Sequence, residues 1–274
     1  MNDILSNPSV EARMLDVDYG TRPVVRGVDL VIVPGTVTTL VGPNGSGKST
    51  LLKALSRLLA PAAGSVLLEG RDIRDLRTRE IARKLSILPQ GPVVPEGVTV
   101  RELVAYGRAP HQGILGIRSR DDIEAVDRAL AMTRIGALAD QPVDALSGGQ
   151  RQRVWIAMTV AQETQVMFLD EPTTYLDIAH QIDVLDLLLT LNRRHGRTVV
   201  MVLHDLNLAA RYSDRMIVLR EGHIIADGSP VSILTPQVLR DAFEIEADIR
   251  QDTVSGCPWF IPLATLTERK EDRP

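Results

Sequence analysis

The stretch Gly42-Pro43-Asn44-Gly45-Ser46-Gly47-Lys48-Ser49-Thr50 decides the fold of this chain of 274 residues. It has the spacing of a phosphate loop, G-x-x-x-x-G-K-[ST]. The apolar run Val37–Val41 before it predicts a strand, and Thr50–Leu59 after it predicts a helix, which is the context that the loop requires. Glycines let successive N–H groups turn toward phosphate oxygens, and the helix N-terminus and Lys48 add positive charge. We therefore expect a nucleoside triphosphate here, with the Ser49 hydroxyl available to magnesium.

The composition is that of a globular chain, with 44% apolar and 24% charged residues. A net charge of −4 gives no electrostatic footprint for nucleic acid. The single cysteine, Cys257, excludes an intramolecular disulfide and suits a reducing compartment, and its default role is a small apolar side chain. We expect no signal peptide over Met1–Met14 and no membrane span, because no apolar run approaches ~18 residues. Any membrane role would then come through a partner.

The other apolar runs outline a sheet whose strands alternate with helices. Strands are expected at Leu15–Val17, Val28–Val33, Gly64–Gly70, Leu85–Leu88, Val166–Leu169 and Thr198–Leu203, and a hairpin at Met216–Leu219 and Ile224–Ala226. A helix is expected over Ile178–Arg194, with an apolar face of Ile178, Ile182, Leu185, Leu188 and Leu189. This alternation predicts an α/β fold with a mostly parallel sheet covered on both faces.

Between Gly91 and Ala161 the pattern changes. Apolar residues such as Ile123, Val126 and Leu130 recur at helical spacing, and no strand-like run occurs. We therefore expect one domain over 10–264, with a nucleotide-binding core at 10–90 and 162–264 and a helical subdomain at 91–161. A polar tail follows at 265–274.

Two further strands lead to side chains that suit phosphate chemistry. Val166–Leu169 is followed by Asp170 and Glu171, and Thr198–Leu203 is followed by His204. Parallel strands share a carboxyl edge, so these side chains should gather near the phosphate loop. Asp170 would hold magnesium, Glu171 would accept a proton from the attacking water, and His204 would contact the γ-phosphate.

Each of these side chains also has an ordinary role open to it. Asp170 could be structural, Glu171 a surface carboxylate, and His204 a hydrogen-bonded core histidine. Gln90, where the sheet gives way to the helical segment, is either a plain loop residue or reaches magnesium or the water. Tyr19, at the end of the first strand, either packs or stacks its ring on a base.

A second candidate anion site is Leu146-Ser147-Gly148-Gly149-Gln150. Ser147 fits an N-cap, and Arg151–Val160 fits the helix that follows, so unbonded N–H groups should lie at the helix start. The chain thus carries two phosphate-binding helix starts but one lysine loop.

This ordered series of motifs resembles the ATPase subunits of ABC transporters, from Tyr19 to about Leu263. The matching segments are Tyr19, Gly42–Thr50, Gln90, Leu146–Gln150, Val166–Glu171, Tyr175–Asp177 and His204. The resemblance implies a P-loop NTPase fold, in which the mostly parallel core carries an antiparallel β subdomain and the helical insertion. It also implies that the chain binds and hydrolyses ATP. The Mg²⁺ ion that accompanies ATP would be held by Ser49, Gln90 and Asp170.

The same resemblance implies a head-to-tail dimer of two copies. ATP on Lys48 of one copy would be covered by Ser147–Gln150 of the other, which accounts for the surplus anion site. Glu171 would be the general base, and Asp177 would help the two sites communicate.

Four stretches are similar to the importer branch for ferric siderophores, haem and cobalamin: Val104–His111, Glu171–Gln181, His204–Tyr212 and Asp252–Pro258, of which the last resembles siderophore members most. The resemblance implies integral membrane permease subunits docked around Gln90–Gly107, a substrate-binding protein that acts indirectly, and a place on the cytoplasmic face of the cell membrane. ATP-driven closure would move the helical segment against those permease helices. No spaced His/Cys/carboxylate cluster makes His111 or Cys257 an iron ligand.

Two other classes stay open at this stage. One is a soluble ABC protein of DNA repair, ribosome rescue or cofactor assembly. Repair members carry long coiled-coil insertions, and ribosomal members usually have two ATPase units in one chain. This chain has neither feature. The other is the ATPase subunit of an exporter. Only the resemblance to the importer branch speaks against it.

Overall fold

The computed structural model describes residues 9–94, 96–113 and 116–266. The chain divides into two compact units, one formed by residues 1–73 and 200–274 and the other by residues 74–199. The division into a nucleotide-binding core at 10–90 and 162–264 and a helical subdomain at 91–161 stays a prediction. Most of the predicted polar tail, residues 267–274, lies outside the described residues.

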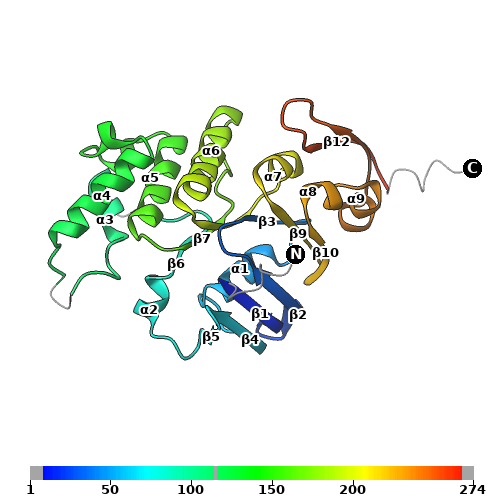
Figure 1. Cartoon of the computed structure of the whole chain (residues 1–274), viewed down its shortest axis with the longest axis horizontal. Coiled ribbons are helices and arrows are strands. Elements are labelled where there is room, and N and C mark those ends of the chain that lie inside the picture. Colours follow the sequence, from blue (N-terminus) through cyan, green and yellow to red (C-terminus); the bar gives the residue numbers. More distant parts are fainter. Residues whose placement is uncertain (1–8, 95, 114–115, 267–274) are drawn as a thin grey trace, which may run out of the picture. The chain divides into compact units, whose positions relative to one another are not determined.

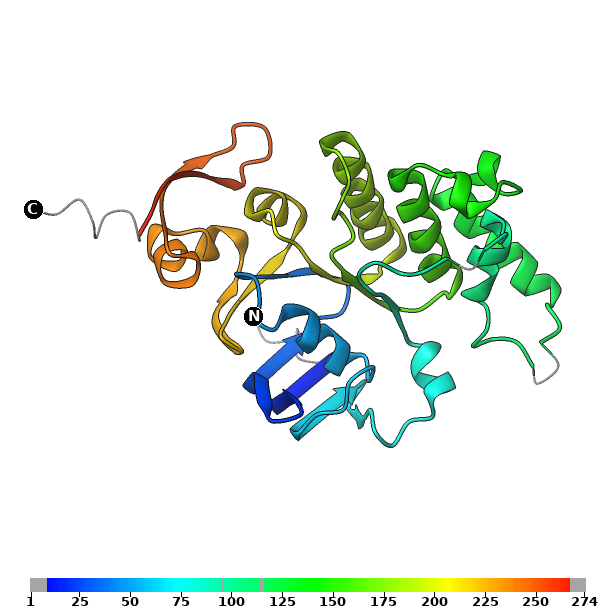
Figure 2. The ribbon, with the colours of Figure 1, turned by 180° about the vertical axis from the view of Figure 1, so that it is seen from behind.

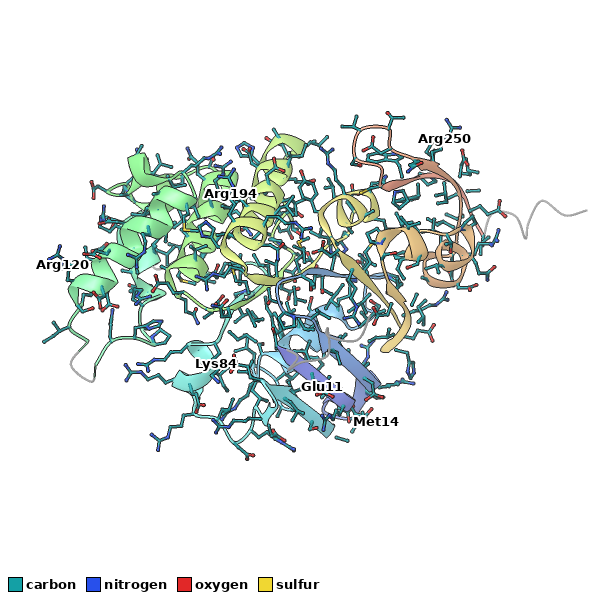
Figure 3. All side chains as sticks on the ribbon, in the orientation of Figure 1. Glu11, Met14, Lys84, Arg120, Arg194 and Arg250 are labelled. Carbon is teal, nitrogen blue, oxygen red and sulfur yellow. The ribbon has the colours of Figure 1, made fainter. Side chains whose placement is uncertain are left out.

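An antiparallel sheet opens the first unit. β1 (Val10–Tyr19) pairs with β2 (Arg22–Ile32) and with β4 (Ala63–Leu68), and β5 (Arg71–Asp72) closes the order β2-β1-β4-β5 (Figure 1). β1 and β2 are longer than the sequence predicts, and the pairing of β1 with β2 is irregular around Met14. Met14, labelled in Figure 3, is 62% exposed with φ 43°, so the apolar pattern of β1 is broken there.

A second part of the first unit contains buried parallel strands. β3 (Val37–Val41) pairs in parallel with β9 (Arg215–Arg220), β9 forms an antiparallel hairpin with β10 (His223–Gly228), and β8 (Thr198–Val202) follows β3 in the order β10-β9-β3-β8. Every residue of β3 and β8 is buried. These strands and the hairpin confirm the elements expected from their apolar runs.

Helix α1 (Lys48–Leu55) ends earlier than the predicted Leu59. Arg57 has a left-handed φ of 61°, and the N–H of Leu58 bonds to the carbonyl of Lys53 at 2.9 Å. This is the hydrogen-bond pattern of a Schellman stop, which usually carries glycine. The end of the helix was not predicted because an arginine, and not a glycine, stands at this position.

The C-terminal part of the first unit contains α7 (Leu206–Tyr212), α8 (Pro230–Ile233), α9 (Pro236–Phe243) and a hairpin of β11 (Ile245–Gln251) and β12 (Pro258–Thr265). These elements were not predicted from the sequence. The side-chain amide of Asn207 on α7 accepts from the N–H of Phe260 at 2.9 Å and donates to its carbonyl at 3.2 Å, so it ties β12 to the helix.

The second unit combines two parallel strands with helices. β6 (Leu85–Leu88) pairs with β7 (Val166–Asp170). The helices are α2 (Thr78–Ala82), α3 (Val100–Tyr106), α4 (Arg120–Met132), α5 (Gly148–Ala161) and α6 (Ile178–His195), with short 3₁₀ turns η1 (Gly136–Leu138) and η2 (Val143–Ala145). Helices α3, α4 and α5 pack on one another, as Figure 2 shows from behind. Over residues 91–161, where the sequence predicts helices, the described residues form helices and turns with one isolated bridge.

A buried ion pair joins the turn after α3 to the first turn of α4. Arg108 and Asp122 are about 5% and 4% exposed and lie 2.9 Å apart, and Arg108 also bonds to Glu163 at 2.8 Å. Burial opposes ionisation of Asp122, but hydrogen bonds from Ser119 and Arg108 outweigh it and lower the pKa of this carboxyl.

The predicted apolar face of α6 is partly wrong. Ile178 is 76% exposed, since it lies in the first turn beside the N-cap Asp177, and the buried face begins at Val184 and continues through Leu185, Leu188 and Leu191. Over the described ranges, no helix combines the length and apolar character that a membrane crossing needs.

Candidate nucleotide-binding site

The phosphate loop of the first unit depends on its glycines. Gly42, Gly45 and Gly47 have φ values of 149°, 77° and 102°, which L side chains rarely adopt. A Cβ atom on Gly42 would lie 2.1 Å from the carbonyl oxygen of Leu219, and one on Gly47 would lie 2.9 Å from the carbonyl oxygen of Val24. The loop therefore turns as a phosphate cradle requires and packs closely against β9 and β2.

Lys48 lies across this loop. Its side chain is buried, and its Nζ donates to the carbonyl oxygens of Gly42 and Pro43, both at 2.9 Å. The turn between β9 and β10 braces the loop from outside, because the N–H of Gly222 donates to the carbonyl of Ser46 at 3.1 Å. The ammonium group is thus held at the start of α1, where the helix N-terminus also favours an anion.

Two other predicted side chains belong to the same unit. Tyr19 is 50% exposed at the end of β1, so its ring is accessible for stacking. His204 follows β8 and is exposed, which rules out the alternative that it is a core histidine.

The second unit places Gln90 and Glu171 in contact. Asp170 is the buried last residue of β7, and Glu171 follows it with a left-handed φ of 54°. The side chain of Gln90 donates from Nε2 to Glu171 Oε2 at 2.8 Å, and Thr174 Oγ1 donates to the same oxygen at 2.9 Å. These two donors hold the Glu171 carboxylate in one rotamer.

Sequence reasoning missed Thr174. Its signal was a hydroxyl three residues after a carboxylate, in a turn that the N–H of Thr174 closes on the carbonyl of Glu171.

The start of α5 has the N-cap that the sequence predicts. Ser147 Oγ accepts from the N–H of Gln150 at 3.3 Å, and the Gln150 side chain accepts from the N–H of Ser147 at 3.1 Å, which completes a capping box. Gly148 is exposed and Gly149 is buried. The first-turn N–H groups of a helix lack an intrahelical partner, so this terminus suits an anion.

Asp177 caps α6, and the same carboxylate holds a histidine that sequence reasoning also missed. Its Oδ1 accepts from the N–H of His180 at 2.9 Å and from His180 Nδ1 at 2.7 Å. These two bonds from His180, the backbone one first, lower the pKa of Asp177. Asp177 therefore stays ionised at the exposed N-terminus of α6.

A glycine cradle with a buried lysine and a strand that ends in two carboxylates define a P-loop nucleoside triphosphatase. Among the described residues, no group of three or more His, Cys, Asp and Glu side chains is arranged to hold a metal ion.

The chain belongs to the ABC transporter family, whose match covers residues 25–174. It is 50% identical to the Bacillus subtilis "Probable siderophore transport system ATP-binding protein YusV", over 93% of this chain and 92% of that protein. It is 46% identical to the B. subtilis iron(3+)-hydroxamate import ATP-binding protein FhuC, over 96% and 98% of the two chains. The Escherichia coli ferric enterobactin transport ATP-binding protein FepC is 48% identical, over 93% and 94%.

Solved structures agree with the fold. The ADP conformation of the ATP-binding cassette MJ1267 superposes with a TM-score of 0.76 at 25% identity, covering 85% of this chain and 97% of that one. A dimeric MJ0796 cassette bound to ADP and Pi gives a TM-score of 0.70 at 29% identity, over 80% and 98%. These comparisons confirm the P-loop fold and the ATPase activity, and ABC ATPases act as dimers with membrane permease partners.

Proposed function

We propose that this chain is the ATP-hydrolysing subunit of an importer for an iron–siderophore complex, with haem and cobalamin as the neighbouring cargo classes. The observation that carries the proposal is that relatives matching over nine-tenths of their length are ATP-binding proteins of siderophore transport systems. Those relatives give no support to a soluble ABC protein outside transport or to an exporter.

The phosphate loop and Lys48 would bind the triphosphate, and Tyr19 would stack on the base. The backbone turns of Gly42, Gly45 and Gly47 and the burial of Lys48 support this assignment. His204, exposed at the end of β8, would contact the γ-phosphate.

Ser49, Asp170 and Gln90 would hold magnesium. A hydroxyl, a carboxylate and an amide oxygen form the oxygen donor set that this ion prefers, and Gln90 uses its nitrogen, not its oxygen, in the bond to Glu171. When bound, the ion would neutralise charge on the phosphate oxygens.

Glu171 would act as the general base of hydrolysis. Water attacks the γ-phosphorus, its proton passes to the Glu171 carboxylate, and the bond to the β-phosphate oxygen breaks. The donors Gln90 and Thr174 support this role, because a base must be held in one geometry relative to the water.

A second copy would complete the site. Ser147, Gly148 and Asp177 are exposed at their helix starts, and Ser147–Gln150 and Asp177 would cover the nucleotide bound by the loop of the other copy. ATP would then close a head-to-tail dimer.

The permease would dock on the second unit at the cytoplasmic face of the membrane. Val93 is 87% exposed and Tyr106 is 49% exposed, so the segment Gln90–Gly107 offers apolar contacts to permease helices. The substrate-binding protein would act through the permease.

The test is ferric siderophore uptake by cells that lack this gene. We expect uptake to fall to background and to return with the wild-type gene but not with Lys48→Ala. Normal siderophore uptake in the deletion strain would refute the proposal that the cargo is an iron–siderophore complex. Loss of haem or cobalamin uptake instead would show that the importer carries that cargo. Recovery with Lys48→Ala would refute the phosphate-loop assignment.

A further inference from the structure

His180 of α6 lies against Gly149 of α5. A Cβ atom on Gly149 would lie 2.3 Å from the ring carbon Cδ2, 2.8 Å from Cγ and 3.0 Å from Nε2. Gly149 has no positive φ, so its helical backbone would accept any L residue. An added Cβ at this position would therefore clash with the imidazole ring and not with the backbone.

The neighbouring glycine behaves differently. A Cβ atom on Gly148 would meet nothing within 4 Å. The two glycines lie side by side in the first turn of the same helix, yet one is open to solvent and the other is covered by His180.

The ring of His180 is not free to swing away. Its Nδ1–H donates to Asp177 Oδ1 at 2.7 Å, and the same oxygen accepts the N–H of His180 at 2.9 Å. The side chain of His180 is 43% exposed, so water reaches one side of the ring while the other side meets Gly149. His180 thus links the start of α5 to the start of α6.

We propose that His180 is a positioning residue that joins Gly149 to Asp177, so that the two helix starts meet the nucleotide of a second copy as one rigid surface. This inference rests on the proposed function, in which Ser147–Gln150 and Asp177 belong to that surface. Helix N–H groups bind an anion well only when their directions are fixed, and misplacement by ~1 Å can reduce a rate by ~100-fold. The ring supplies that constraint from outside the helix.

The first experiment measures the contact itself, in nucleotide-free protein. Gly149→Ala should raise the unfolding equilibrium constant on the order of tenfold relative to Gly148→Ala, because overpacking outweighs the gain in helix propensity that both changes share. His180→Ala should remove that penalty for Gly149→Ala and leave the effect of Gly148→Ala unchanged. Additive effects of Gly149→Ala and His180→Ala would overturn the inference.

The second experiment measures the positioning role in a Glu171→Gln background, by ATP-driven dimerisation in gel filtration. His180→Ala should weaken dimerisation on the order of tenfold while ATP affinity of the single copy is unchanged. His180→Asn keeps a donor for Asp177 but removes the ring edge, so it should relieve Gly149→Ala fully and restore dimerisation in part.

The outcomes separate the two proposals. Unweakened dimerisation of His180→Ala would overturn the positioning role while the proposed function stands. A Gly149–His180 coupling without any ATP-driven dimer of the Glu171→Gln parent would overturn the proposed function and, with it, the role in dimerisation.

Discussion

Replacement of Gly42 by alanine tests how tightly the phosphate loop packs. The added Cβ would lie 2.1 Å from the carbonyl oxygen of Leu219 and 2.9 Å from Ser46 Oγ, at a φ of 149°. Leu219 belongs to β9, whose residues Arg215–Val218 pair in parallel with β3. The carbonyl therefore moves only if the sheet or the loop shifts.

The expected penalty has two parts. An overpacked contact costs about 1–3 kcal/mol, and a non-glycine residue in this backbone region costs about 1–3 kcal/mol. We expect Gly42→Ala to lower the free energy of unfolding by about 2–6 kcal/mol, the sum of the two. Gly45→Ala is the matched control, because Gly45 has φ 77° but no atom within 4 Å of its added Cβ, so it bears the backbone cost alone.

Urea unfolding and titration with a fluorescent ATP analogue measure the two effects. Gly42→Ala should unfold at lower urea than Gly45→Ala and should bind ATP on the order of 100-fold more weakly than the parent, because the loop is displaced. Equal unfolding midpoints and equal ATP affinities for the two variants would refute the packing argument.

Two further predictions concern the second unit. The pKa of Asp122 is lowered in the folded chain, so the stability it contributes is complete above the ordinary carboxyl pKa of about 4 and is lost as the pH falls through the lowered value. Asp122→Asn should remove that acid-dependent loss in thermal melts. It should cost about 1–3 kcal/mol at neutral pH, because Arg108 loses one of its two carboxylate partners and keeps Glu163; an unchanged melting profile would contradict this. Thr174→Val should reduce kcat about 2- to 20-fold with little change in KM, since one donor to Glu171 is lost, whereas Thr174→Ser should retain most of the rate; a loss seen in KM alone would argue against a positioning role.

The parts of the fold that the sequence predicts are those with local causes. The phosphate loop, the buried strands and the N-cap at Ser147 follow from glycine spacing, apolar runs and a capping residue within a few positions. The β11–β12 hairpin was missed because its alternation is weak, and it is interrupted by prolines such as Pro262.

The contacts that sequence reasoning missed join segments that are distant along the chain. Nothing near Gly149 indicates that a ring from α6 covers it, and nothing near Phe260 indicates its two hydrogen bonds with Asn207. The end of α1 at Arg57 was missed for another reason, because a residue other than glycine adopts the left-handed conformation. Tertiary packing thus decides which of several locally acceptable conformations is adopted.

In the proposed closed dimer, the phosphate loop of one copy and the α5 start of another enclose ATP, with Glu171 as the base. Gel filtration and ATP turnover of Glu171→Gln measure whether this dimer forms and whether Glu171 is the base. We predict a monomer without nucleotide, a dimer with ATP, and hydrolysis reduced about 10- to 1,000-fold. A Glu171→Gln protein that stays monomeric at saturating ATP and hydrolyses ATP at the parent rate would refute both the closed dimer and the role of Glu171.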